Sequence, residues 1–150
     1  MNTCFDVANY FLRSQNEDIG ENISNMKLQK LVYYAQGIYL AMKDEPLFNE
    51  PIQAWDYGPV CDPLFQKYKT YGSNPIPLDY DINILELFDK ESLEILNMVN
   101  KHYGQYSAWK LSDMTHKEPP WILAYSKGRG VISHDTMREY FKTQIEDDEE

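Results

Sequence analysis

The sequence has few of the residues on which metal sites and disulfide frameworks depend. Only two cysteines occur among 150 residues, Cys4 and Cys61, which are too few and too isolated for a disulfide framework or a zinc site. The three histidines, His102, His116 and His134, lie apart and form no H-E-x-x-H or comparable pattern. We therefore expect no metal and no cofactor, and a surface or capping role for each histidine.

Long hydrophobic runs are also absent. The longest apolar stretches are interrupted by Lys, Gln or Asp well short of the roughly 20 residues that a membrane-spanning helix needs. The first residues contain no apolar segment followed by a small-residue cleavage site, which a secretory signal peptide would have. The sequence therefore predicts a soluble, cytoplasmic protein without a membrane partner.

Positive charge is scarce. The chain has 14 lysines and arginines against 24 acidic residues, and its formal net charge is −10. Five of the negative charges lie in residues 146–150, which leaves a net charge of −5 on the rest. An acidic surface repels phosphates, which argues against nucleic acid as a partner, and it favours a basic protein. Alternatively, the terminal acidic run only keeps the chain soluble.

Apolar and aromatic residues, by contrast, are plentiful. They make up 43% and 14% of the chain, too much for a disordered protein, and twelve of them are tyrosines. Tyrosine suits half-buried positions and interfaces, although core filling is the simpler explanation for any single one. A chain of 150 residues has the length of one domain, which we place at residues 1–145, followed by an acidic tail at 146–150.

The most informative segment is a predicted helix with little polar surface. At about 100° per residue, one arc of this helix is an ordinary core-facing stripe and the opposite side carries a second stripe. The first arc comprises Leu28, Leu31, Val32, Ala35, Ile38, Tyr39 and Met42, and the second comprises Met26, Tyr33, Gly37 and Leu40. Two narrow polar seams remain, Gln29/Gln36/Lys43 and Lys27/Lys30. We expect this helix to be buried at the centre of the fold, with Lys27 and Lys30 at its polar end.

The remaining pattern predicts a mainly α fold, a single compact domain of about six helices with a small β hairpin near residues 47–55. A capping box at Thr3 and Asp6 opens the first helix. The hairpin would turn at Asn49–Pro51, and Pro59 would begin the next helix. Further helices are predicted near 89–103, 107–115, 121–125 and 133–145. Residues 16–21 and 73–81 are predicted connections.

Residues that could carry enzymatic chemistry are scattered. The segment 127–130 (Lys-Gly-Arg-Gly) offers backbone donors and positive charge but lacks the P-loop pattern, so a plain loop is the simpler interpretation. Cys61 follows a turn near a helix start, where a thiol pKa can fall, yet no histidine is near it in sequence. We therefore keep an enzyme, with a site around Cys61 or His116, as the weakest hypothesis.

The segment from Trp55 to Val60 is more distinctive. It places two aromatic residues and an acid, Trp55, Tyr57 and Asp56, on a turn stiffened by Gly58 and Pro59. Rigid aromatic side chains with polar groups are typical of the residues that dominate binding energy at protein interfaces. The structural alternative is that Trp55 anchors the hairpin to the core while Gly58 and Pro59 only shape the turn.

Three groups of residues form a specific pattern when they occur in this order. They are the run K-L-Q-K-L-V-Y-Y-A-Q-G at 27–37, the run I-Q-A-W-D-Y-G-P-V at 52–60 after Leu47–Phe48, and L-S-D-M-T-H at 111–116 followed by Pro120–Trp121. Together they resemble the Panacea (SocA-like) antitoxin domain family. The resemblance extends from about residue 4 to 141. It implies an antitoxin of bacteria or phages that binds a toxin protein encoded nearby, and it supplies no catalytic motif.

We therefore predict a type II antitoxin that neutralises its toxin by direct binding. The resemblance also implies an alternative, an adapter that delivers the toxin to an ATP-dependent protease, as at least one member of the family does. The predicted partner-binding residues are Lys27, Lys30, Trp55, Asp56, Tyr57, Gly58 and Pro59.

Overall fold

The computed structural model describes residues 1–15, 23–77 and 81–149, which contain eight α-helices and a two-stranded sheet. The helices are α1 (Cys4–Arg13), α2 (Asn25–Lys43), α3 (Asp62–Tyr68), α4 (Ile84–Leu87), α5 (Lys90–Tyr103), α6 (Ala108–Thr115), α7 (Pro119–Ser126) and α8 (His134–Glu149). The strands are β1 (Gln53–Trp55) and β2 (Gly58–Val60), and a 3₁₀ turn, η2, spans Lys69–Tyr71. The predicted mainly α fold with a small hairpin is confirmed, with α4 among the helices that the pattern did not predict.

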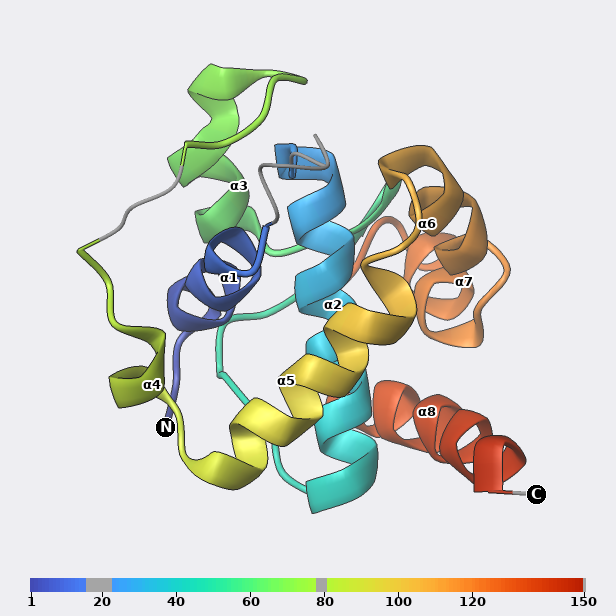
Figure 1. The fold of residues 1–150 in the computed structure, drawn as a ribbon. Helices are drawn as coiled ribbons and strands as arrows, with labels where there is room; N and C mark the ends of the chain where they lie inside the picture. The colour runs from blue at the N-terminus through green and yellow to red at the C-terminus, as the bar shows by residue number, and fades with distance from the viewer. Residues whose placement is uncertain (16–22, 78–80, 150) are drawn as a thin grey trace.

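The expected central helix is α2. It runs through the middle of the molecule, with α1 to its left, α5 crossing in front of it, and α6 and α8 to its right (Figure 1). Every residue of α2 from Leu28 to Ala41 is buried, so both apolar stripes are covered by neighbouring elements. The prediction that this helix is buried rather than exposed as a groove is confirmed.

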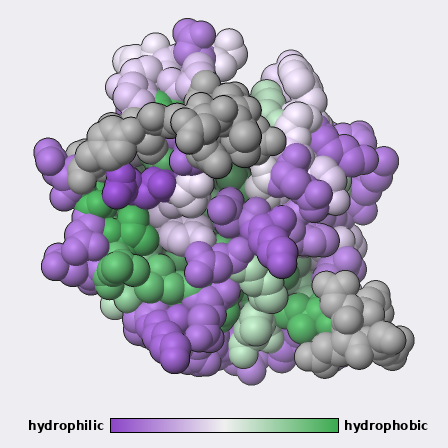
Figure 2. Space-filling view, viewed as in Figure 1, coloured by the Kyte–Doolittle hydropathy of each residue, from purple (hydrophilic) through white to green (hydrophobic). Residues whose placement is uncertain are grey.

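The surface on the side shown in Figure 1 is uneven in polarity. Hydrophilic side chains cover much of α5, whereas hydrophobic side chains gather over α4 (Figure 2). Leu85 of α4 is 75% exposed. Isolated exposed leucines are common on soluble proteins, so this residue by itself marks no binding site.

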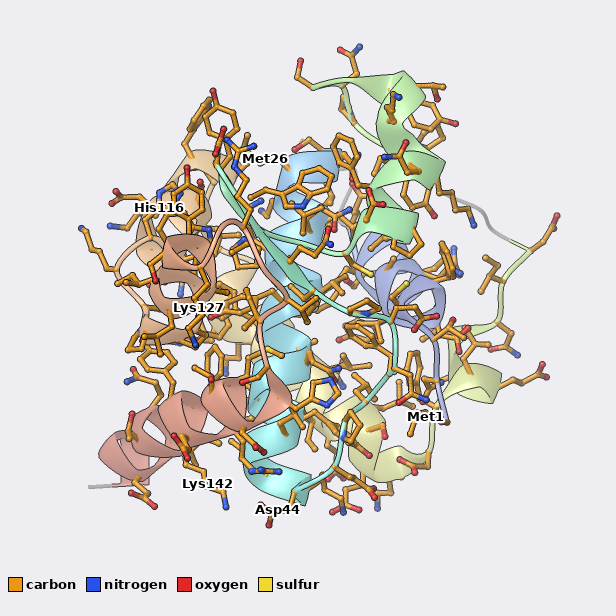
Figure 3. All side chains as sticks on the ribbon, turned by 180° about the vertical axis from the view of Figure 1, so that it is seen from behind. Met1, Met26, Asp44, His116, Lys127 and Lys142 are labelled. Atoms are coloured by element: carbon orange, nitrogen blue, oxygen red, sulfur yellow. The ribbon has the colours of Figure 1, made fainter. Side chains whose placement is uncertain are left out.

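The segment after α2 returns along that helix and is held by glutamine side chains. Asp44, at the end of α2, accepts a hydrogen bond of 2.8 Å from Lys142 of α8, and the chain then runs back toward the hairpin (Figure 3). Gln36 donates to the carbonyl of Phe48 at 2.7 Å and accepts from the N–H of Leu47 at 2.8 Å. Gln29 accepts from the N–H of Cys61 at 2.9 Å. Two of the three residues of this predicted polar seam of α2, Gln29 and Gln36, therefore make buried hydrogen bonds, and the third, Lys43, pairs with Glu91 at 2.6 Å.

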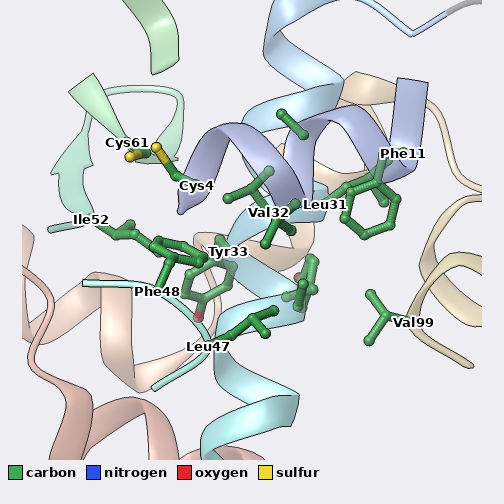
Figure 4. Close-up of a cluster of buried hydrophobic side chains, with 14 of the residues drawn as sticks. Cys4, Phe11, Leu31, Val32, Tyr33, Leu47, Phe48, Ile52, Cys61 and Val99 are labelled. Carbon is green, nitrogen blue, oxygen red and sulfur yellow. The ribbon is translucent and has the colours of Figure 1, made fainter. Parts of the chain in front are cut away.

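One part of the core lies between α1, α2 and the returning segment. Phe11, Leu31, Val32 and Phe48 are all completely or almost completely buried there (Figure 4). Each fully buried side chain of this kind contributes about 1.5–3 kcal/mol through the hydrophobic effect. Burial in this region therefore supplies the main stabilisation of α1 against α2.

The C-terminal half is joined to α2 by a buried carboxyl group. Glu118 accepts hydrogen bonds from the hydroxyls of Tyr33 (3.0 Å) and Tyr34 (2.9 Å), and Tyr140 of α8 bonds to it as well. Burial raises the pKa of Glu118 to about 7, although the tyrosine hydrogen bonds counteract part of this rise. Next to this cluster, Gly37 leaves room for the ring of Phe141.

The hairpin lies later in the chain than predicted. Strands β1 and β2 pair antiparallel, with Gln53 opposite Val60 and Trp55 opposite Gly58, so the turn is Asp56–Tyr57 rather than Asn49–Pro51. The outer edge of β1 is also paired, because the N–H of Ala54 donates to the carbonyl of Gly130 at 3.0 Å. The prediction that Pro59 begins a helix is wrong, since it lies in β2, where a short edge strand tolerates proline.

The helix that follows, α3, begins at Asp62 with a proline in its first turn. Predicted helix starts elsewhere are confirmed by their caps: the Thr3–Asp6 capping box is present, and Ser24, Asp89, Ser107 and Ser133 each accept a hydrogen bond from the first turn of their helix. The predicted connection at 16–21, part of the predicted loop at 73–81 and the side chains of 147–150 lie outside the described residues.

Candidate functional site

The predicted partner-binding residues separate into two groups in the structure. Lys30, Trp55, Asp56 and Tyr57 line one cleft. Gly58 and Pro59 are buried beneath it, and Lys27 donates a hydrogen bond of 2.8 Å to the carbonyl of Gly104. The candidate site is therefore the cleft together with the hairpin turn, on the side of the molecule where Met26 and His116 are labelled (Figure 3).

The side chain of Asp56 fixes the tip of the hairpin. Its carboxylate accepts a hydrogen bond of 2.7 Å from the hydroxyl of Tyr125 and forms an ion pair with Arg129 at 2.7 Å. The backbone carbonyl of Asp56 lies 2.9 Å from Nε2 of His116. Three side chains, from the residue after α6, from α7 and from the loop after α7, therefore hold one residue of the turn.

The backbone on either side of Asp56 is held in the same way. Nε1 of Trp121 donates to the carbonyl of Trp55 at 2.8 Å, and the hydroxyl of Ser112 donates to the carbonyl of Tyr57. The ring of Trp121 is itself stacked on Tyr125, with centroids 4.5 Å apart. Because these bonds fix successive carbonyl groups, the turn has little freedom to move relative to α6 and α7.

Gly58 is required by the close passage of another chain segment. Its φ of +120° is a conformation that side-chain-bearing residues rarely adopt. A Cβ atom here would lie 2.7 Å from Cε of Lys30 and 2.8 Å from Oγ1 of Thr115. The glycine of the W-D-Y-G-P-V run thus allows the hairpin to cross directly over the Lys30 side chain.

Lys30 is a buried cation without a counterion. Only 1% of its surface is exposed, and burial lowers the pKa of its amine to about 7. No described residue gives it a hydrogen bond or an ion pair. Every fully inaccessible side-chain nitrogen or oxygen in the described residues has a hydrogen-bond partner. The Lys30 amine therefore retains access to solvent, which the cleft it lines provides.

The cleft has a volume of about 460 Å³, within the range of typical ligand pockets. Its walls are mostly apolar and aromatic, and its charged groups are mainly cationic. The residues that matter for its chemistry are Lys30, Trp55, Asp56, Phe65, Lys69 and Arg129. Trp55 packs edge-on against Phe65, with ring centroids 5.1 Å apart.

An exposed aromatic pair borders the cleft. Tyr57 is 60% exposed and Trp109 is 67% exposed, and their rings meet at a right angle with centroids 6.0 Å apart. The sequence predicts Tyr57 as a binding residue, but it places Trp109 only in a helix and Arg129 only in a loop. One feature of the sequence could have identified Trp109. It lies two residues after the helix cap Ser107, so a large apolar side chain occupies the exposed first turn of the helix.

The hypothesis of an enzyme site around Cys61 and His116 lacks the geometry on which it depends. The thiol of Cys61 faces Cys4 (Figure 4), whereas the ring of His116 packs against Trp121. The loop at 127–130 is no anion cradle either, because all four of its backbone N–H groups donate to carbonyls of α7. Within the described residues, no group of three or more His, Cys, Asp or Glu side chains could hold a metal ion.

No helix in the described part of the chain is long and apolar enough to cross a membrane. Residues 28–122, which include most of α2, the hairpin and most of the cleft, match the family described as "Antitoxin SocA-like, Panacea domain". The chain belongs to this family. The resemblance seen in the sequence is thereby confirmed.

One curated relative of this SocA-like chain is Antitoxin SocA of Caulobacter vibrioides (strain NA1000 / CB15N). The two are 42% identical over 120 residues, which cover 73% of this chain and 64% of the relative. The chain thus spans less than two thirds of the length of that relative. No solved structure matches the chain.

Proposed function

We propose that this protein is an antitoxin that neutralises a toxin protein by binding it directly, through a surface centred on Tyr57 and Trp109. The observation that carries the proposal is the exposure of these two large aromatic side chains beside a cleft, in a chain of an antitoxin family. Aromatic residues at the centre of an interface contribute a large part of its binding energy.

The rigidity of the turn supports this assignment. Binding through a flexible loop costs about 0.5–1.5 kcal/mol for each ordered side chain, and a preorganised surface avoids part of that cost. The carbonyl groups of Trp55, Asp56 and Tyr57 are all bonded to α6 or α7. The turn is thus already ordered before a partner arrives.

The charge of the chain indicates the overall character of the partner. With a net charge of −10, the antitoxin would attract a protein with a basic surface, and this attraction would speed their encounter. We expect the complex to form in the cytoplasm, as for a type II toxin–antitoxin pair. Higher salt should accordingly slow association more than it speeds dissociation.

The test is co-expression with the product of the adjacent gene. We expect the two proteins to copurify and the antitoxin to restore growth to cells that express the toxin. Tyr57→Ala and Trp109→Ala should each weaken binding by about 30-fold or more, the range of interface hot spots.

A matched control is Leu85→Ala, which removes another exposed apolar side chain, on α4. It should leave binding unchanged, and circular dichroism should show all three variants folded. Equal binding by wild type, Tyr57→Ala and Trp109→Ala would show that the interface lies elsewhere. Absence of both copurification and growth rescue would reject the antitoxin proposal.

The adapter alternative predicts a different fate for the toxin. If the antitoxin delivers it to an ATP-dependent protease, the half-life of the toxin should fall when the antitoxin is present and recover in cells that lack the protease. Simple sequestration predicts an unchanged or longer half-life. Pulse-chase measurements in both strains distinguish the two mechanisms.

A further inference from the structure

The cleft beside the hairpin turn combines an apolar interior with an unsatisfied cation. Lys30 lies at its inner wall, 1% exposed and without a hydrogen-bond acceptor or counterion among the described residues. An isolated buried charge is costly, and proteins normally pair such a group or lose its charge. The amine of Lys30 can therefore form an ion pair with an anionic group from outside the chain.

Among the cations of the cleft, Lys30 is the buried one, whereas Lys69 is exposed and Arg129 is paired with Asp56. The titratable and charged residues that line the cleft with it are Asp56, Tyr57, Lys69 and Arg129. Asp56 is the only acid in this set, and its carboxylate already bonds to Tyr125 and Arg129. His116, from α6, bonds to the backbone of Asp56 rather than to a group in the cleft.

The walls of the cleft indicate what kind of anion fits. Trp55 and Phe65 form an aromatic side, and Met26 and Val60 contribute further apolar surface. A strongly hydrated, multiply charged group such as a phosphate would lose most of its water against these apolar walls. A singly charged carboxylate on an apolar stem matches both the walls and the buried amine of Lys30.

We propose that this cleft is a carboxylate-binding site, which receives an acidic side chain of the toxin and pairs it with Lys30. The proposal rests on the proposed function, because it assigns the carboxylate to the protein partner. It adds an anchor inside the cleft to the aromatic surface at Tyr57 and Trp109, which lies at the rim.

A proton should bind together with the toxin. The pKa of Lys30 is about 7 in the free protein, and a carboxylate in contact with the amine raises that pKa. The free amine is mostly neutral at pH 8 and mostly charged at pH 6, so close to one proton is taken up at pH 8 and almost none at pH 6. By linkage, the affinity should be about fivefold weaker at pH 8 than at pH 7.

The first experiment measures binding of the product of the adjacent gene by calorimetry at pH 6, 7 and 8, at each pH in two buffers that differ in ionisation enthalpy. The dependence of the enthalpy on the buffer gives the number of protons taken up. Lys30→Met keeps the length of the side chain and removes the amine, and it should bind at least tenfold more weakly and without proton uptake. Its thermal midpoint should be equal to or above that of wild type, because a buried charge without a partner is removed.

The matched control is Lys101→Met, which makes the same change in charge at an exposed position of α5 outside the cleft. It should retain both the affinity and the proton uptake. If Lys30→Met binds as tightly as wild type and wild type takes up no proton, the carboxylate site is rejected while the antitoxin proposal stands. If wild type does not bind the toxin, both proposals are rejected.

A second experiment uses the wild-type chain and does not depend on how the variant folds. Lysine amines labelled by ¹³C-methylation are titrated by NMR with benzoate and, as the neutral match, benzamide. Benzoate at millimolar concentration should raise the pKa of the most strongly shifted amine by at least half a unit, and benzamide should leave it unchanged. No response to benzoate would overturn the assignment of the cleft.

Discussion

Replacing Gly37 by alanine tests how tightly α8 packs on the central helix. A Cβ atom at this position would lie 2.1 and 2.2 Å from two atoms of the Phe141 ring. Carbon atoms in contact are separated by about 3.5–4 Å, so the ring would have to move by more than about 1 Å. Phe141 is completely buried and its ring packs edge-on against Tyr33 and Tyr34, with centroids 5.6 and 5.8 Å away. Any such shift would disturb both contacts.

The expected magnitude follows from two opposing effects. In an unobstructed helix, glycine to alanine stabilises a protein by about 1 kcal/mol. Overpacking a close-packed core costs about 1–3 kcal/mol, and here the clash is near the severe end. We therefore expect Gly37→Ala to lower the free energy of unfolding by about 1–2 kcal/mol, the opposite sign from the helix propensity.

The assay is urea unfolding of wild type, Gly37→Ala, Phe141→Leu and the double variant. Leucine at 141 removes ring atoms, so the new methyl group would be better tolerated and the two changes should couple by about 1 kcal/mol or more. A Gly37→Ala protein more stable than wild type, or strictly additive changes, would refute the close packing of α8 on α2.

Three further predictions concern buried groups. The pKa of Glu118 is raised from 4.5 to about 7, so its favourable contribution to stability is complete below pH 4.5 and is lost as the pH rises through 7. Wild type should therefore lose about 3 kcal/mol relative to Glu118→Gln between pH 4.5 and 8, measured by urea unfolding. Gln36→Ala leaves two backbone groups without their partners and should cost about 2–5 kcal/mol of unfolding free energy in the same assay. Cys4 and Cys61 are buried and should react with Ellman's reagent only after the protein is unfolded.

The burial of α2 could be predicted because hydrophobic periodicity records where apolar side chains lie. The function of its polar residues could not be predicted in this way. Gln29 and Gln36 look like a solvated seam when only polarity is counted, yet both are buried and hydrogen-bond the segment that follows. Their role depends on partners 11 or more residues away, and no local pattern identifies these partners.

The position of the hairpin illustrates a second limit. The order Asn49-Glu50-Pro51 is a good local turn signal, but Gln36 holds the preceding residues in an extended segment against α2. The observed turn at Asp56–Tyr57 depends on bonds from Tyr125, Trp121 and Ser112, which come from distant helices. Tertiary contacts therefore override the local preference.

The part of the candidate site that comes from one continuous segment could be predicted from the sequence. Trp55, Asp56 and Tyr57 lie together because they are consecutive, and the aromatic composition marked them. Trp109 and Arg129 join them only through the placement of α6 and of the loop after α7. The burial of Lys30 could not be predicted, because it depends on the hairpin passing over this side chain at Gly58.

The residues of the W-D-Y-G-P-V run have different roles where the hairpin passes over Lys30. Gly58 and Pro59 are buried and shape the hairpin over Lys30, and Asp56 is bonded on both its side chain and its backbone. Tyr57 is the member whose side chain remains mainly exposed. The same framework can therefore present different side chains at positions 57 and 109 without losing the cleft or its buried amine. Recognition of one toxin rather than another should depend on the aromatic rim, and the anchoring carboxylate should be common to toxins bound by chains that retain Lys30.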